Sequence, residues 1–345
     1  MYRYVQDFVL NFSSIFWEAL PFIVLGALIA GLLEELLPQS WITRLMPRQA
    51  LPAVLIGGCL GLIFPMCECG IVVVMRRLLR KGLPLSCCIS YMLAGPIVNV
   101  IVLLSTYIAF GQHQIGYEMV ALRAGLGFFV AVITGLIVHV AANTSSTPLL
   151  KASALPPPLP KAISLNLIED APTAEPDMPK SILSRIDNIT RTALHDFMDI
   201  TVFLILGAVL AALAKIFIDP NDIESLSREA PYLSIPAMML LAVILCLCSE
   251  ADAFVAASFT EMSVSSKLAF LVLGPMLDLK LILMYTSVFR LKLIVILICC
   301  TTTLTLLSTI AVHQVYNPAP GAGAGTTVSL GGDATATTPT TTPKP

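Results

Sequence analysis

The residues best suited to chemistry are two pairs of cysteines, each separated by one residue. Cys67 and Cys69 flank Glu68, and Cys246 and Cys248 repeat the spacing. Thiolates select soft ions such as Cu(I), Zn(II) or trivalent metalloids, so two facing pairs could supply up to four sulfurs. Residues two apart on a helix project about 200° from each other, so both thiols of a pair reach one ion only where the helix is interrupted. The alternative is that these cysteines are small apolar fillers.

Ionisable residues inside apolar segments are the second group of candidates, because a charge at membrane depth is costly and therefore functional by default. Glu68 could harden a metal site or carry a proton against the substrate. Structural ion pairing is the alternative, although Asp278 and Lys280, two residues apart, suit opposite sides of a helix better than a mutual bridge. The group consists of Glu68, Glu250, Asp252, Asp278 and Lys280.

Residues that interrupt helices lie beside these candidates. Pro65 and Gly70 bracket the first cysteine pair. The segment 51–81 is too long for one simple span, since about 30 helical residues reach roughly 45 Å across a hydrocarbon core of about 30 Å. Later prolines free carbonyls that can line a cavity, with a polar residue one turn beyond each. These elements are Gly95, Pro96 and Asn99, and Gly274, Pro275 and Asp278. Ordinary kinks are the alternative.

The composition indicates what must position these residues. Of 345 residues, 57% are hydrophobic and only 12% are charged, about half the usual share of roughly 25%. We predict an all-α polytopic membrane protein with about eight transmembrane helices. They lie near the N-terminus, up to about residue 37, and near 51–65, 86–110, 119–140, 193–217, 234–249, 268–288 and 291–312. A formal charge of −2 gives no reason to expect nucleic acid as a partner.

An internal repeat organises the chain. Cys67 and Cys246 are separated by a fixed number of residues, which we call the cysteine offset. The same offset pairs Cys69 with Cys248, the first Gly-Pro element with the second, and Asn99 with Asp278. A slightly longer offset pairs segment 22–28 with 203–209. We expect two four-span membrane repeats, 1–141 and 193–315, with a Pro-rich linker at 142–192 and a disordered tail at 316–345. An even number of spans makes the copies parallel, whereas a re-entrant segment would invert them. Transporters commonly bind substrate between such repeats.

Basic residues predict the orientation. Arg76, Arg77, Arg80 and Lys81 crowd what we expect to be a short loop, and the linker adds further lysines and arginines, so both segments should face the cytoplasm. In the eight-span scheme both termini lie on that side too. Four basic residues fit this scheme less well, namely Arg44, Arg48, Arg290 and Lys292.

The motifs resemble a known family. Segment 65–99, with PMCECG, RRLLRKG and LAGPIVN, is similar to the predicted permease family that includes bacterial organoarsenical efflux permeases. In the second half, LCSEADAFVAASF at 247–259 and LGPMLDLK at 273–280 are similar to one branch of it. The resemblance implies a multi-pass permease of the bacterial inner membrane, exporting arsenicals or metal ions in some members. The chain departs from the family at Arg76 and Arg77, where small residues are more usual, and at Glu250 and Asp252.

Three hypotheses for the function remain. The first is a secondary transporter that exports a soft metal ion, a metalloid or a related small solute through a cavity between the repeats. The second is a membrane thiol oxidoreductase that uses the paired cysteines, although Cys-x-x-Cys is the commoner dithiol spacing. The third is a membrane scaffold subunit. No nucleotide-binding loop or nucleophile elbow is present in the sequence, so we expect a permease and no enzyme, with no cofactor. The expected partners are the lipid bilayer and a small inorganic or organometalloid solute, with proton coupling possible and the oligomeric state open.

Overall fold

A computed structural model describes residues 2–36, 47, 49–64, 66–111, 115–144, 149–150, 182–217, 231–259 and 262–316. These residues form α-helices, apart from turns and one isolated bridge between Leu150 and Phe289. The first half holds α1 (Tyr2–Leu36), α3 (Ala50–Ile63), α4 (Glu68–Arg80), α5 (Leu85–Ala94), α6 (Val100–Gly111) and α7 (Gly116–Thr144). The second half holds α8 (Ile182–Phe217), α10 (Pro231–Leu245), α11 (Asp252–Ser258), α12 (Val264–Leu273), α13 (Leu279–Val288) and α14 (Leu291–Tyr316).

Among the described helices, four are long and apolar enough to cross a membrane: α1, α7, α8 and α14. Their apolar stretches are 25 to 29 residues long, or about 38 to 44 Å, which exceeds the roughly 30 Å of a hydrocarbon core. Many of their large apolar side chains point away from the protein, as lipid contact requires. The prediction of an all-α polytopic membrane protein is confirmed.

The short helices α3 and α4 form a hairpin that enters and leaves on one side. Gly57 of α3 packs against Cys87 at the start of α5, and Gly61 packs against Gly95 at its end, so α3 and α5 run in parallel. Helix α4 joins the end of α3 to the start of α5 and must therefore return to the side from which α3 came. At about 20 Å each, neither helix could cross alone. The described residues at the tip of this re-entrant hairpin are Phe64, Met66 and Cys67.

Helices α5 and α6 make one interrupted crossing. The chain breaks at residues 95–99 and continues into α6. Helix α7 runs back along both pieces, because Gly116 packs against Tyr107 of α6 and Gly135 packs against Ser86 of α5. The Gly95-Pro96 element therefore marks a full break in the predicted third span.

The second half repeats this order. Ser234 of α10 is hydrogen-bonded to Ser266 of α12 at 2.7 Å, and Ala242 lies against Gly274, so α10 and α12 run in parallel and α10 and α11 form a second re-entrant hairpin. Its tip, residues 246–251, begins at Cys246, whose φ of 48° lies in the left-handed region. Residues other than glycine rarely adopt this backbone conformation, so α10 cannot continue as a regular helix through Cys246. Helices thus break at both Cys-x-Cys segments, as their spacing predicts.

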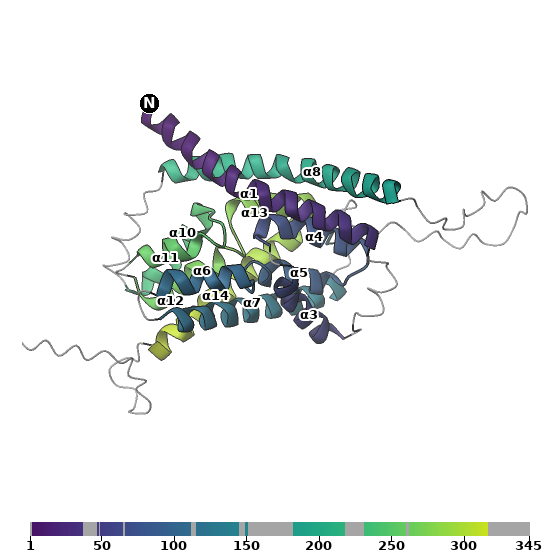
Figure 1. Cartoon of the computed structure of the whole chain (residues 1–345). Helices are drawn as coiled ribbons and strands as arrows, with labels where there is room; N and C mark the ends of the chain where they lie inside the picture. Colours follow the sequence, from purple (N-terminus) through teal and green to yellow (C-terminus); the bar gives the residue numbers. More distant parts are fainter. Residues whose placement is uncertain are drawn as a thin grey trace, which may run out of the picture.

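The two halves run in opposite directions. Gly31 near the end of α1 packs against Ile189 near the start of α8, while Ile15 clusters with Ala208 and Ala211, so α1 and α8 are antiparallel. Figure 1 shows the two helices side by side along one face of the molecule. In each half, a long helix, an interrupted crossing and a second long helix traverse the protein, whereas the hairpin does not. An odd number of crossings gives the inverted arrangement in place of the parallel one expected from four full spans per half.

This topology places Arg76, Arg77, Arg80 and Lys81 of α4 at one end, which we call the linker end. Helices α1 and α7 end there, and α3, α5, α8 and α14 begin there; Arg290 N donates to Leu149 O at 3.0 Å beside the start of α14. Of the residues that fitted the eight-span scheme poorly, Arg44 and Arg48 lie between α1 and α3 in the sequence, Arg290 directly precedes α14, and Lys292 is in the first turn of α14. The first residues of α1 and the last of α14 lie at the opposite end (Figure 1).

Three sequence expectations need further comment. Arg76, Arg77 and Arg80 lie on α4 itself and not in a loop, and Lys81 is its C-cap. Helix α8 begins at Ile182, so the stretch before the expected fifth span is continuous with it. The tail after Tyr316, most of the linker and Pro65 lie outside the described residues.

Candidate functional site

The two hairpin tips meet at a small buried cavity. All four cysteines of the repeated pairs line it, together with Glu68 at the start of α4 and Lys280 at the start of α13. Helix α1 closes it with Ile15, Glu18 and Ala19. The cavity has a volume of about 10 Å³, which is close to the room that one water molecule or one small ion needs.

Broken backbone brings the thiols to one place. Cys67 has extended backbone (φ −71°, ψ 168°) and caps α4, so Cys67 and Cys69 are not two apart on a regular helix. Cys67 Sγ, a carboxylate oxygen of Glu68 and Cys248 Sγ all lie within 4.8 Å of one another, and the three residues are buried. This group holds one thiol from each half of the chain and one hard oxygen, a combination that suits a soft or borderline ion.

Lys280 supplies the positive charge of the cavity. Its Nζ lies 2.8 Å from Glu68 Oε1, 3.5 Å from Asp278 Oδ2 and 3.4 Å from the carbonyl oxygen of Cys246. The expectation that Asp278 and Lys280 would not bridge is therefore wrong. Asp278 precedes α13 in an extended conformation and caps it, with Oδ1 accepting from Leu281 N at 2.6 Å, so helical geometry does not separate the pair.

Acceptor atoms are available beside the thiols. Glu68 Oε2 is buried and has no hydrogen-bond partner among the described residues, and Cys248 Sγ donates to Glu250 Oε2 at 2.6 Å. Burying an unsatisfied carboxylate oxygen is costly. Cys67 and Cys248 therefore lie next to carboxylate oxygens, from Glu68 and Glu250, that can accept their protons or share a bound ion.

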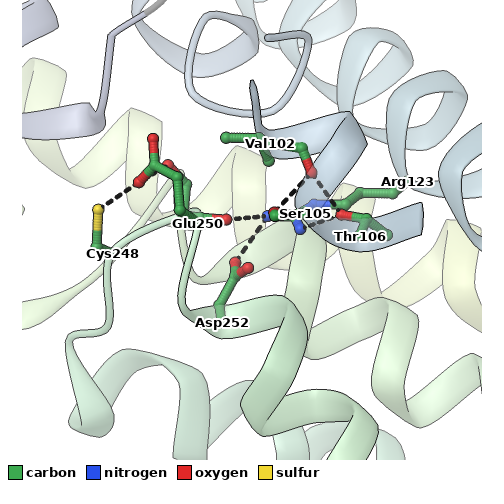
Figure 2. A network of polar contacts seen from close by, with 8 residues as sticks. Val102, Ser105, Thr106, Arg123, Cys248, Glu250 and Asp252 are labelled. Carbon is green, nitrogen blue, oxygen red and sulfur yellow. Dashed lines mark hydrogen bonds and ion pairs between the residues drawn. The ribbon is translucent and has the colours of Figure 1, made fainter. Parts of the chain in front are cut away.

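A polar network centred on Arg123 holds the second tip (Figure 2). Arg123 of α7 donates to Asp252 Oδ2 at 2.8 Å, to Ser249 O at 3.1 Å and to Thr106 Oγ1 of α6 at 2.7 Å. None of these residues lines the cavity, so Asp252 contacts Arg123 and not the thiols. The guanidinium group has 0% exposure.

Sequence reasoning missed Arg123 and Glu18. Both lie inside predicted apolar spans, so the cost of a charge in the membrane, which selected Glu68, would have selected them too.

The remaining candidates take structural positions. Asn99 precedes α6 as Asp278 precedes α13, and its Oδ1 accepts from Ile101 N at 3.0 Å. Asn99 does not line the cavity. Gly70 packs against Gly26 of α1, and Gly95 packs against Gly61 of α3. Pro96 and Pro275 lie in the turns after α5 and α12, next to Gly95 and Gly274.

Comparisons with known proteins find relatives among predicted permeases. A sequence model of the ArsP_1 family, described as predicted permeases, matches residues 5–314. The UPF0718 protein YcgR of Bacillus subtilis (strain 168) is 36% identical over 288 residues, which cover 83% of this chain and 90% of that protein. A Streptococcus mutans protein, provisionally named as a subunit of a two-component membrane permease complex, is 34% identical over 284 residues, which cover 82% and 87%.

No solved structure matches the chain. The family match spans both membrane halves, both hairpins and every residue that lines the cavity. The chain therefore belongs to the family of predicted permeases.

Proposed function

We propose that this permease is a secondary transporter that exports a soft metal ion, a trivalent metalloid or a related small solute through the thiol cavity between its halves. The observation that carries this proposal is the approach of Cys67 Sγ, Glu68 and Cys248 Sγ within 4.8 Å of one another at the hairpin tips. The two hairpins enter from opposite ends of the protein and their tips meet in between. The thiols therefore lie where a solute from either side would arrive.

The chemistry of the cavity suits a species that exchanges ligands with thiols. A soft ion would replace the protons of Cys67 and Cys248 and take the carboxylate of Glu68 as a third ligand. A neutral metalloid with two hydroxyl groups would condense with the two thiols and release two water molecules, with no change in oxidation state. The small volume excludes a hydrated ion, so a cargo would shed its water on entry.

We infer that the halves are inverted copies of one ancestral unit, 1–141 and 193–315, joined by the 142–192 linker. Support comes from the matching order of helices and from the cysteine offset that relates the two Cys-x-Cys tips. Inverted repeats let the same fold open toward either side of a bilayer around one binding site. Basic residues at the linker end favour a bacterial inner membrane with that end in the cytoplasm.

The test is transport by the full-length chain. A deletion strain is exposed to Zn, Cu, Cd, arsenite and methylarsenite, and uptake of the most toxic species into inverted membrane vesicles is then measured. We expect a Cys67→Ser or Cys248→Ser variant to lose at least tenfold in flux per folded molecule. A Cys87→Ser variant is the matched control, because Cys87 is buried on α5 and does not line the cavity.

Normal flux in both cavity variants would contradict the proposal. Redox cycling of these thiols in cells without any solute flux would favour the thiol oxidoreductase instead.

A further inference from the structure

The α1–α8 pair rests on one side of the molecule, and two glycines make the contact. Gly26 of α1 lies so close to Gly70 of α4 that an added Cβ would come within 2.9 Å of the Gly70 Cα. Gly207 of α8 packs in the same way on Lys280 of α13, with 2.8 Å from such a Cβ to the Lys280 Cα. The two glycines are equivalent in the repeat, because the offset that pairs segment 22–28 with 203–209 also pairs Gly26 with Gly207. We call the α4–α13 surface the first seat.

The fold contains a counterpart of this seat. The cysteine offset relates α4 to α11 and α13 to α6, and α6 and α11 pack against each other as α4 and α13 do. Among the described helices, α1 packs extensively on α4 and α8 on α13, whereas neither packs extensively on α6 or α11. We call the α6–α11 surface the second seat.

Burial shows that one face of the second seat is uncovered. Met75 of α4 and Lys280 of α13 are 0% and 2% exposed, whereas their counterparts Phe254 of α11 and Ile101 of α6 are 51% and 50% exposed. Further exposed apolar side chains lie on the same helix, namely Val100, Leu104, Tyr107 and Ile108. A pseudo-twofold axis relates the two inverted halves and exchanges the two seats. The second seat is therefore an exposed apolar surface, whereas its counterpart, the first seat, is covered by α1 and α8.

We propose that the second seat is a docking surface for the α1–α8 pair, and that transfer of the pair between the seats is the movement that transports solute. In the second position α1 lies on α6, with Gly26 facing Ile101, and α8 lies on α11. The pseudo-twofold axis exchanges α1 with α8, so the pair has the same shape before and after the exchange. The contacts between α1 and α8 can therefore be kept during the transfer. Related seats built from related sequences differ little in free energy, as a two-state switch requires.

The transfer would change access to the thiols. Ile15, Glu18 and Ala19 of α1 form one wall of the cavity while the pair occupies the first seat. Helices α4 and α13 lead from the hairpin tips toward the linker end, so moving the pair would open a route to the cavity from that end. The pair would then cover the route beside α6 and α11, toward the opposite end. This step rests on the proposed function, because it assumes that the thiol cavity holds the cargo. The docking itself does not depend on the identity of the cargo.

Photo-crosslinking in native membranes tests the docking. The photoreactive amino acid p-benzoylphenylalanine replaces Ile101 in the full chain, and cross-linked peptides are identified by mass spectrometry. We expect crosslinks from position 101 to α1 peptides of the same chain. Replacing Val140 in the same way is the control, because Val140 is exposed on α7, which does not pack extensively on α1, and it should yield no such crosslinks.

A second variant shifts the equilibrium. Gly70→Ala changes only the first seat, where Gly70 lies against Gly26, so it should raise the yield of the crosslink from position 101 to α1 severalfold. If position 101 reacts only with lipid, or with a second copy of the chain, in both backgrounds, the proposal is overturned. Crosslinks to α1 without any thiol-dependent flux would retain the docking and remove the proposed cargo.

Discussion

Arg123 and Asp252 form a buried ion pair of 2.8 Å between the two halves of the chain. Arg123 belongs to α7 of the first half, and Asp252 begins α11 of the second. The same guanidinium also binds the carbonyl oxygen of Ser249, one residue after Cys248. The position of the second thiol pair therefore depends on a residue of the other half.

Removing one partner of this pair should be far more harmful than removing both. Arg123→Met leaves Asp252 buried without a counter-charge and should cost roughly 3–5 kcal/mol, whereas Arg123→Met with Asp252→Leu should recover most of the loss. Thermal unfolding of the purified protein in detergent measures the difference. The control is Arg191→Met, which breaks an exposed pair with Asp187 and should have little effect. An Arg123→Met variant as stable as this control would contradict the expectation.

The cavity thiols should behave as one unit. If Cys67 and Cys248 hold the same ion, each serine replacement alone should abolish flux, and the double replacement should be no worse than either. Vesicle uptake, normalised to folded protein, measures the coupling. The pair Cys87→Ser and Cys88→Ser is the control, being equally buried on α5. Additive losses that follow protein abundance would indicate two independent packing roles.

The Glu68–Lys280 pair separates folding from transport. Lys280→Met should lower the amount of folded protein, because it leaves Glu68 charged and buried. Adding Glu68→Gln should restore folding but not flux, since the carboxylate is lost from the thiol group. Size-exclusion chromatography and vesicle uptake report the two effects. Full flux in the double variant would show that Glu68 serves only as the partner of Lys280.

The hairpins predict the topology. Reporters fused after Lys81 and after Lys161 should both report the cytoplasm, because basic residues gather at the linker end. A reporter fused after Tyr316, at the end of α14, should report the opposite side of the membrane. Alkaline phosphatase and green fluorescent protein fusions distinguish the two locations. A cytoplasmic signal from the last fusion would mean that segments 51–65 and 234–249 cross the membrane completely.

Several properties of this protein follow from its sequence alone. Low charge and long apolar stretches require a helical membrane protein, since only segments with internally satisfied backbone can lie in lipid. The Cys-x-Cys spacing required interrupted helices if both thiols of a pair were to reach one ligand, and the chain breaks at both places. The motifs around Cys67 and Cys248 also identified the permease family.

The tertiary structure decided direction and partners. Hydropathy measures how long an apolar segment is, and a long stretch such as 51–81 fits the bilayer either as a tilted crossing or as a hairpin. The packing of Gly57 on Cys87 and of Gly61 on Gly95 selects the hairpin, and this choice inverts the second half. Arg123 and Asp252 are 129 residues apart in the chain, so no local spacing could have paired them. Their contact exists only because two oppositely directed halves pack around one buried cavity.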